Sequence, residues 1–244
     1  MQLCASPPAA LGAIGVDWGT THRRACALGT DGRCIRAVAD AQGMLSARGR
    51  FESALEELLG AFGTVPATTP VVLSGMVGSA QGWVDAGYLE LPLPLASLRE
   101  RLVPVPSARA GVVIVPGVIG RGGTQLDVMR GEEAQLLGAV ALGHADGWFV
   151  LPGTHSKWVR VESGAIVDFA TYMTGELFAL LSRHGTLAAA MEEGGADSHR
   201  AEAFDEGLNA AADGALSNLL FGVRARVVGA AMAACDAPSY LSGL

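Results

Sequence analysis

Two stretches of this chain share one pattern, in which an apolar run leads into glycine and hydroxyl residues and a second apolar run follows. The first stretch is Ile14–Leu28, and between its two runs stand Asp17, Gly19, Thr20 and Thr21. Short aliphatic runs are typical of buried strands, and a glycine at the bend lets backbone N–H groups turn toward an anion. The pattern predicts a β-hairpin whose tip is suited to bind a phosphate.

The second stretch repeats this outline. It is Phe149–Val161, and the residues at its tip are Gly153, Thr154, His155, Ser156 and Lys157. The two glycine-threonine pairs lie 134 residues apart, a separation that matches one domain better than a short repeat. We therefore expect a duplicated α/β fold in which both tips bind the same polyphosphate.

The composition indicates a globular protein that acts on small molecules. Half of the 244 residues are apolar, which is enough for a substantial core. The net charge of -7 lacks the basic excess of proteins that bind nucleic acids or anionic membranes, and no apolar run is long enough to span a bilayer. We expect a cytoplasmic protein without either partner, and a homodimer is left open.

The cysteines and the single lysine carry separate expectations. Cys4, Cys26, Cys34 and Cys235 show no CxxC pairing, so they are expected to be free thiols in a reducing compartment and to hold no metal. Lys157 is the only lysine among seventeen basic residues, and it stands at the second tip. Because a compact ammonium can approach a phosphate oxygen as a point charge, this position predicts a phosphate-binding role.

The remaining patterns predict helices and strands between the two tips. An amphipathic helix is expected over residues 51–59, and buried strands are expected over 70–73 and 111–115. A small-residue helix over 134–142 would connect the two halves, with acids in its first turn. Residues 81–94 show no periodicity and are expected to form an irregular loop that lines a site.

Two groups of motifs resemble known families. Asp17-x-Gly19-Thr20-Thr21 and the matching Gly153-Thr154 resemble the two phosphate motifs of the actin-like ATPase superfamily, which includes sugar kinases and Hsp70 chaperones. The segments 127–133, 151–158 and 173–178, taken together, resemble the 2-dehydro-3-deoxygalactonokinase family. The resemblance implies a duplicated ribonuclease H-like fold with two domains around a central cleft.

The resemblance also implies a domain organisation in which each part of the chain binds a different substrate. Residues 1–11 would be a flexible lead, 12–145 an N-terminal sugar-acid-binding domain, and 146–244 a C-terminal nucleotide-binding domain. The second domain would stop about forty residues short of an equal repeat.

The implied activity is ATP-dependent phosphorylation of the 6-hydroxyl of 2-dehydro-3-deoxy-D-galactonate, a step of galactonate breakdown. The alternatives are another sugar or sugar-acid kinase of the same superfamily, or a non-catalytic actin-like ATPase or binding module.

Phosphoryl transfer needs donors on the phosphates, a divalent cation held by a carboxylate, and a base near the acceptor hydroxyl. Asp17 is expected to hold a hydrated Mg²⁺, which commonly takes only one or two carboxylates. The residues expected to contact the phosphates of ATP are Gly19, Thr20, Thr21, Gly153, Thr154, His155, Ser156 and Lys157.

The choice of base stays open between Glu132 and Asp127. In related sugar kinases the base is a carboxylate that follows a glycine at the start of the connecting helix, and Gly131-Glu132 matches that place. Asp127 lies five residues earlier and competes with it. A third reading is that Glu132 and Glu133 only complement the positive end of a helix. A base must come within about 2.6–3.2 Å of the acceptor hydroxyl, so geometry would decide.

The sugar acid is expected in the first half, where a buried strand ends in small residues followed by polar and aromatic ones. The residues expected to line its site are Ser74, Gly75, Met76, Gln81, Trp83 and Tyr88. Either Arg23 or Arg130 is expected to pair with the substrate carboxylate through its planar guanidinium.

Overall fold

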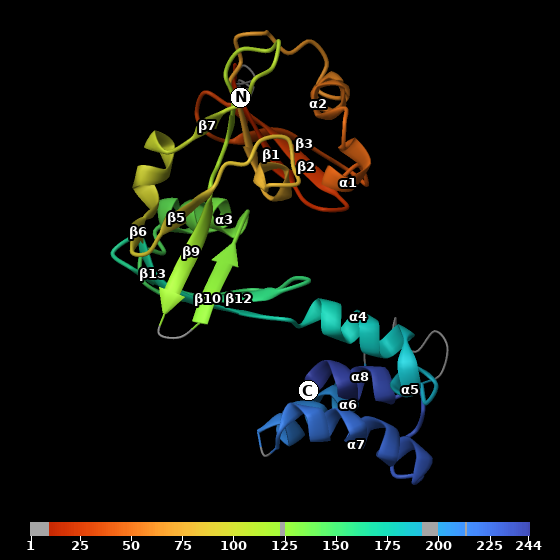
Figure 1. Ribbon diagram of the computed structural model, residues 1–244. Helices are drawn as coiled ribbons and strands as arrows, with labels where there is room; N and C mark the ends of the chain where they lie inside the picture. Colours follow the sequence, from red (N-terminus) through yellow and green to blue (C-terminus); the bar gives the residue numbers. More distant parts are fainter. Residues whose placement is uncertain (1–9, 123–124, 192–199, 213) are drawn as a thin grey trace, which may run out of the picture. The chain divides into compact units, whose positions relative to one another are not determined.

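The computed structural model describes residues 10–122, 125–191, 200–212 and 214–244, and it has the α/β class that the sequence predicts (Figure 1). Its strands are β1 (Leu11–Trp18), β2 (Arg23–Gly29), β3 (Cys34–Asp40), β4 (Val71–Ser74), β5 (Tyr88–Glu90), β6 (Leu93–Pro94), β7 (Val103–Pro104), β8 (Val112–Ile114), β9 (Gly117–Gly122), β10 (Gln125–Met129), β11 (Gly147–Leu151), β12 (Ser156–Glu162) and β13 (Ala165–Tyr172). Its α-helices are α1 (Met44–Ala47), α2 (Phe51–Gly60), α3 (Glu132–Ala141), α4 (Gly175–Arg183), α5 (Gly185–Ala188), α6 (Ala201–Ala211), α7 (Leu216–Val228) and α8 (Ala237–Gly243), and its 3-10 helices are η1 (Met76–Gly78) and η2 (Leu95–Glu100). Most of the expected flexible lead, residues 1–11, lies outside the described residues.

The largest sheet has six strands in the order β3-β2-β1-β4-β8-β7. β1, β2 and β3 form an antiparallel meander, whereas β4 and β8 run parallel to β1. A meander followed by parallel strands on the far side of β1 is the order of the ribonuclease H-like fold. The first predicted hairpin and the two strands expected after it are confirmed.

One face of this sheet packs on α1 and α2 (Figure 1). Ile14, Val16 and Trp18 alternate along β1 toward this core, as the period of two in a strand requires. The predicted amphipathic helix over 51–59 is α2, and it contributes Leu55 and other apolar side chains to the same core. The alternate residues of β1 therefore point to the opposite face.

Two smaller sheets have the orders β10-β9-β5 and β11-β12-β13-β6. β11 and β12 pair in antiparallel fashion with Leu151 opposite Lys157, which confirms the second predicted hairpin. Leu136 of α3 is buried in one core with Val159 and Val161 of β12. β5 and β6 lie where the sequence predicts only an irregular loop. They are three and two residues long, too short to show a period in the sequence.

The chain forms two compact units, which we describe separately. Unit 1 comprises the chain up to Leu151 together with Lys157–Thr171, and unit 2 comprises Pro152–Ser156 and Tyr172–Leu244. Unit 2 contains α4 to α8, which surround a core of their own. In the described part of the chain, no helix is both long and apolar enough to cross a membrane. Because most of the β11–β13 sheet belongs to unit 1, the units do not follow the boundary expected near residue 145. The division into two functional domains stays a prediction.

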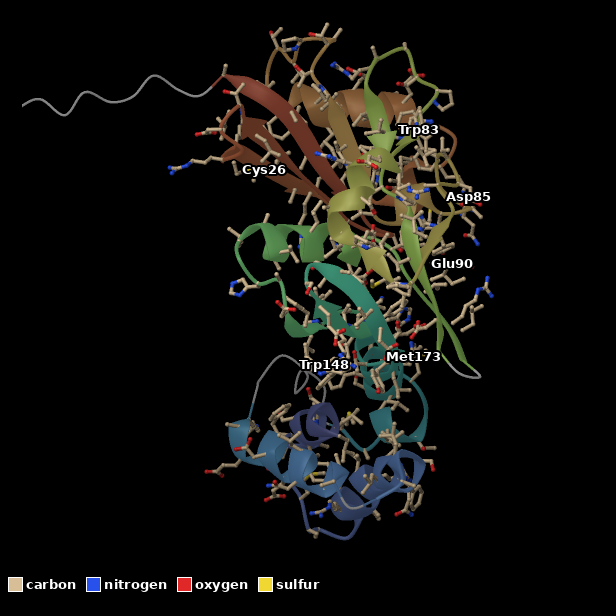
Figure 2. The ribbon with its side chains drawn as sticks, turned by 90° about the vertical axis from the view of Figure 1, so that its left-hand side faces the viewer. Cys26, Trp83, Asp85, Glu90, Trp148 and Met173 are labelled. Atoms are coloured by element: carbon tan, nitrogen blue, oxygen red, sulfur yellow. A yellow bond between two sulfur atoms is a disulfide. The ribbon has the colours of Figure 1, made fainter. Side chains whose placement is uncertain are left out.

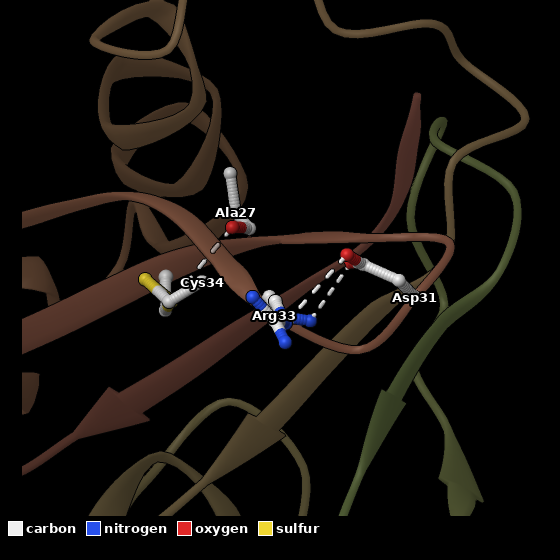
Figure 3. The surroundings of a disulfide bond; sticks show 5 residues. Ala27, Asp31, Arg33 and Cys34 are labelled. Atoms are coloured by element: carbon white, nitrogen blue, oxygen red, sulfur yellow. Dashed lines mark hydrogen bonds and ion pairs between the residues drawn. A yellow bond between two sulfur atoms is a disulfide. The ribbon is translucent and has the colours of Figure 1, made fainter. Parts of the chain in front are cut away.

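The prediction of free thiols is wrong for two of the four cysteines. Cys26 of β2 and Cys34 of β3 form a disulfide with their Cα atoms 6.0 Å apart (Figure 3). The turn between the strands is held by Asp31, whose Oδ1 accepts the backbone N–H of Arg33. In the β2–β3 register Cys26 pairs with Ala37 and Cys34 pairs with Leu28, so the two cysteines lie diagonally across the strands. They are eight positions apart in sequence, a separation that a search for CxxC spacing misses. Cys235 is a free thiol, and Cys4 lies outside the described residues.

Candidate active site

Asp17 stands at the carboxyl end of β1, on the sheet face that points away from α2. The strand register pairs it with Arg24 of β2 and with Ser74 of β4. Its pKa is raised above the ordinary value, mainly by desolvation; the charge of Arg24 lowers this pKa and the charge of Glu132 raises it. A bound cation would relieve both causes of the increase, so the site fits a carboxylate that binds a metal ion.

Three backbone segments pack closely beside Asp17. Gly75 has a φ of +88°, and a Cβ there would lie 2.9 Å from the carbonyl oxygen of Trp18 and 3.2 Å from Oδ1 of Asp17. Gly131 has a φ of +109°, and a Cβ there would lie 3.2 Å from the Cα of Gly75. Both the backbone conformation and the spacing require glycine at these positions. This packing fixes the beginning of α3 next to the end of β1.

Glu132 is the first residue of α3, and it forms an ion pair with Lys157. The Nζ atom of Lys157 lies 2.8 Å from Oε1 of Glu132, and the two side chains are only 11% and 18% exposed. The backbone N–H of Arg130 donates to Oε2 of Glu132 at 3.0 Å. Two partners on its two oxygens give this carboxylate a defined position. Lys157 and Glu132 are thus in contact within unit 1. The sequence predicts a role for each of them separately.

Glu133 is completely buried beside Glu132. Its Oε1 and Oε2 both accept the backbone N–H of Gly131, at 2.9 and 2.8 Å. Burial raises the pKa of Glu133 to about 8; backbone hydrogen bonds and the charge of Arg130 lower it, and the charge of Glu132 raises it. The sequence analysis treats this residue only as an acid at a helix start. The signal for its role is an acid two residues after a glycine that must bend the chain.

Asp127, the other candidate base, is engaged in holding two strands. Its Oδ1 accepts the backbone N–H of Val128 at 2.7 Å, and its Oδ2 accepts that of Thr171 at 2.6 Å. The second bond ties β10 to β13 within unit 1. Asp127 therefore stabilises the contact between two strands, whereas Glu132 forms an ion pair with Lys157.

The tip of the first hairpin rests on the beginning of α1. The carbonyl oxygens of Gly19, Thr20 and Thr21 accept backbone N–H groups of Met44, Leu45 and Gly43, at 2.8 to 3.1 Å. Gly43 must be a glycine, because a Cβ there would lie 2.4 Å from the carbonyl oxygen of Thr20. Within the described residues, the N–H groups of Thr20 and Thr21 donate to no backbone oxygen. The carbonyl side of the loop is thus tied to a helix, and its N–H groups can serve an anion.

The second tip, within unit 2, rests on the beginning of α4 in the same way. The carbonyl oxygen of Thr154 accepts the N–H of Glu176 at 3.0 Å, and that of Gly153 accepts the hydroxyl of Thr174 at 3.4 Å. A Cβ on Gly175 would lie 2.6 Å from the carbonyl oxygen of Gly153. Gly43 and Gly175 therefore play the same part in the two hairpins. This correspondence supports an internal duplication.

Side chains of the second tip are bonded to neighbouring residues. The hydroxyls of Ser156 and Thr174 are 2.5 Å apart, and Nε2 of His155 lies 2.5 Å from Oε2 of Glu176. A phosphate would have to compete with these partners for the side chains, but not for the backbone. The assignment of His155 and Ser156 to phosphate binding stays a prediction.

Arg23 is built into the core of unit 1. Its side chain is 1% exposed; Nε and Nη2 donate to Asp40, and Nη1 donates to the carbonyl oxygen of Ala54 at 2.6 Å. Its guanidinium also lies over the ring of Trp18, 5.2 Å from the ring centroid. This arrangement favours a structural role, so of the two arginines considered for the sugar acid we retain Arg130.

The other expected substrate residues fall into separate places in unit 1. Ser74, Gly75 and Met76 lie at the end of β4 beside Asp17, where the Ser74 hydroxyl donates to the carbonyl oxygen of Val16 at 3.4 Å. This group stays close to the candidate metal ligand.

Residues of the following loop are divided between two neighbours. Trp83, labelled in Figure 2, stacks on Phe51 with ring centroids 6.0 Å apart, and Oε1 of Gln81 accepts a hydrogen bond from Arg48. Tyr88 instead lies under the guanidinium of Arg130, 4.4 Å from it. Tyr88 is thus in contact with another expected substrate residue.

A cavity of about 510 Å³ opens on the sheet face that carries Asp17. Its lining is mostly small and apolar, and its polar side chains are Asp17, Arg24 and Ser74. Cys26, on the same face of β2, is also part of the lining (Figure 2). The carboxylate at the end of β1 is therefore accessible from a concave surface.

The combination of an acid at the end of β1, two glycine-threonine tips and a lysine-paired glutamate can be compared with known proteins. A family model described as 2-keto-3-deoxy-galactonokinase matches residues 17–244. The chain belongs to this family. A family member from Rhizobium meliloti (strain 1021), named probable 2-dehydro-3-deoxygalactonokinase DgoK1, is 40% identical over 232 residues, covering 93% of this chain and 76% of the relative.

Two further comparisons agree with the family assignment. The 2-dehydro-3-deoxygalactonokinase of Escherichia coli (strain K12) is 38% identical over 234 residues, covering 95% of this chain and 76% of the relative. A crystal structure of a Sinorhizobium meliloti protein, provisionally described as a 2-dehydro-3-deoxygalactonokinase, matches with a TM-score of 0.85 and 39% identity. That match covers 95% of this chain and 78% of the other. The fold is therefore that of a solved member of the same family.

Proposed function

We propose that this chain is a kinase that transfers the γ-phosphate of ATP to the 6-hydroxyl of 2-dehydro-3-deoxy-D-galactonate. Membership of the family and the names of two relatives at 38% and 40% identity support this activity. The single observation that carries it in the structure is the cluster of Asp17, Glu132 and Lys157 in unit 1, held by the packing of Gly75 against Gly131.

Glu132 is the proposed general base. It accepts the proton of the 6-hydroxyl as that oxygen bonds to the γ-phosphorus and the bond to ADP breaks. Lys157 and the backbone N–H of Arg130 hold its two oxygens in place. Asp127 is less suited, because its Oδ2 ties β10 to β13 through the N–H of Thr171, whereas Glu132 is close enough to Asp17, the proposed metal ligand, to raise the pKa of that residue.

Asp17 is the proposed ligand of Mg²⁺. The ion would neutralise charge on the phosphates during transfer. The raised pKa of Asp17, caused by desolvation and by the nearby Glu132, is the observation that fits a cation at this place. Within unit 1, the other groups that would act on the phosphates are Arg24 and the backbone N–H groups of the first tip.

The two glycine-threonine tips are the proposed phosphate-binding loops. In each, carbonyl oxygens are tied to the start of a helix and a glycine allows the close contact. The remaining N–H groups can donate to phosphate oxygens without a Cβ in the way. We place the reaction in the cytoplasm, where ATP is available.

A panel of acceptors tests the proposed function. The full chain is incubated with ATP and Mg²⁺ and with sugar acids or neutral sugars, and the products are identified by ³¹P NMR. We expect a 6-phosphate of 2-dehydro-3-deoxygalactonate to form fastest. Faster phosphorylation of a neutral sugar would favour another kinase of the superfamily, and phosphate release without any acceptor would favour an ATPase that lacks kinase activity.

A further inference from the structure

We propose that Arg130, together with the hydroxyl of Ser79, binds the carboxylate of the sugar acid and so makes the site selective for acids over neutral sugars. This inference rests on the proposed kinase function and names the residues that bind the carboxylate of its substrate. Arg130 lies at the junction of β10 and α3, two residues before the proposed base. Ser79 directly follows η1, at the end of β4.

The surroundings of Arg130 leave room for a flat guanidinium. One face of it stacks on Tyr88, 4.4 Å from the ring centroid, and Nη2 donates to the carbonyl oxygen of Gly87 at 2.9 Å. A Cβ on Gly78 would lie 3.1 Å from Nη1 of Arg130, and a Cβ on Gly117 would lie 2.8 Å from the ring of Tyr88. Side chains at either glycine would displace the stacked pair. The stack therefore has a specific, preorganised position.

Arg130 keeps donors that are not used by the protein. Among the described residues, its Nε and Nη1 are buried but have no hydrogen-bond partner, and the same holds for the hydroxyl of Ser79. Leaving a buried charged donor unpaired is costly, and the cost is recovered when an anion binds. A Cβ on Gly78 would lie 3.1 Å from Nη1, and Ser79 follows Gly78 in sequence, so the Ser79 backbone lies near this end of Arg130, and we propose that its hydroxyl turns toward the same ligand.

The charge of Arg130 is not cancelled by the neighbouring acids. Glu132 is paired with Lys157 at 2.8 Å. Glu133 has its pKa raised to about 8 by burial, so it is mostly protonated near neutral pH. A carboxylate is the planar anion that matches guanidinium donors, and a hydroxyl adds one further hydrogen bond. The net positive charge next to the proposed base thus suits an acidic substrate.

Entry of the ligand requires a local rearrangement. The unpaired atoms are shielded from solvent, whereas Tyr88 is 43% exposed. The adjoining segment Ser79–Gly87 contains no helix or strand. We expect this segment to give way as the carboxylate reaches Arg130.

The test compares two acceptors in full-length variants. The first acceptor is 2-dehydro-3-deoxygalactonate, and the second is the 3-deoxyketohexose of the same configuration, in which CH₂OH replaces the carboxylate. Arg130→Met should raise KM for the acid by about 10- to 100-fold, and Ser79→Ala by about 3- to 10-fold, as expected for lost hydrogen bonds with and without a charge. KM for ATP and turnover of the neutral sugar should change little, so the preference for the acid falls.

Arg99→Met is the matched control, because Arg99 is 83% exposed and pairs only with a surface acid. It should behave as the wild type in both reactions. Thermal unfolding shows whether Arg130→Met is folded. If it is not folded, the preference for the acid is measured in Arg130→Lys and Ser79→Ala instead. Folded variants that keep the wild-type preference for the acid would overturn the inference.

Direct binding separates this inference from the proposed function. Calorimetry of the sugar acid with the wild type and with Ser79→Ala, without ATP, should show weaker binding by the variant. If the wild type binds the acid through these residues but transfers no phosphate, the kinase assignment fails and the carboxylate site stands. If it transfers phosphate but the variants bind the acid as tightly as the wild type, the carboxylate site fails alone.

Discussion

Asp17, Glu132 and Lys157 form the proposed centre of the reaction in unit 1, and close backbone packing places Asp17 and Glu132 beside each other. Gly75 and Gly131 allow β1, the end of β4 and the start of α3 to approach closely. Glu133 then binds the N–H of Gly131 from inside the core. A change in these supporting residues should therefore alter the site.

The choice of base is decided by a pair of matched substitutions. Glu132→Gln should lower kcat by about 10²- to 10⁴-fold, because it removes the proton acceptor and keeps the shape. Asp127→Asn should change kcat little and should lower the melting temperature, because it weakens the link between β10 and β13. Steady-state kinetics and thermal unfolding of both variants give the answer. A severe loss of kcat in Asp127→Asn, with Glu132→Gln still active, would reverse the assignment.

Glu133 makes stability depend on pH. Its pKa is raised to about 8 in the folded protein, above the ordinary value of 4.5, so the folded state holds a proton that the unfolded state loses. The associated stability is present below pH 4.5 and is lost as the pH rises through 8, by up to about 1.4 kcal/mol per pH unit. Glu133→Gln should remove this loss. The free energy of unfolding by urea is measured for both proteins at pH 5, 7 and 9.

The expected result is that the variant gains stability relative to the wild type as the pH rises from 5 to 9. Glu100→Gln serves as the control, because the Glu100 side chain is 68% exposed. A difference between Glu133→Gln and the wild type that stays the same at all three pH values would show that Glu133 is ionised in the folded protein.

At the scale of elements, the two hairpins share a contact with a helix that their sequences do not predict. Each tip is fastened to the first turn of a helix, α1 in unit 1 and α4 in unit 2, at Gly43 and Gly175 respectively. The repeated glycine-threonine pairs predict the hairpins correctly. They do not predict the fastening, because it depends on residues 20 to 25 positions further along, whose spacing differs between the halves.

Substitution of these two glycines tests the fastening. Gly43→Ala and Gly175→Ala should each lower stability by about 1–3 kcal/mol, because the added methyl group overlaps a carbonyl oxygen of the tip. Each should also raise KM for ATP more than KM for the sugar acid. Gly138→Ala is the control: it lies in α3 with nothing within 4 Å of the added Cβ, and should stabilise slightly. Wild-type KM for ATP in both tip variants would remove the tips from nucleotide binding.

Sequence patterns predict the long elements and miss the contacts between distant ones. Strands β1, β2, β4, β8, β11 and β12 follow from short apolar runs, helix α2 follows from helical spacing of apolar residues, and helix α3 follows from small residues after an acidic first turn. The Cys26–Cys34 disulfide does not, because it depends on the strand register, nor does the burial of Arg23, because its partners Asp40 and Ala54 lie on other elements. Asp17, Glu132 and Lys157 are each predicted, but only the structure shows Glu132 and Lys157 in contact.

At the scale of the whole molecule, family membership and the chemistry of unit 1 lead to the same reaction. The family model extends over residues 17–244, so it includes both tips, the acid pair at α3 and the lysine. A kinase that acts on a sugar acid avoids wasting ATP when its hydrolysis is slow in the absence of the acceptor. Tight dependence of ATP use on the acceptor is therefore the property that distinguishes a kinase from an ATPase of similar fold.

The most direct test measures ADP formation by the purified full chain with ATP and Mg²⁺, in the presence and absence of 2-dehydro-3-deoxygalactonate. We predict that ADP forms rapidly only when the sugar acid is present, with one sugar phosphate for each ADP. ADP formation at the same rate with and without the sugar acid would contradict the account.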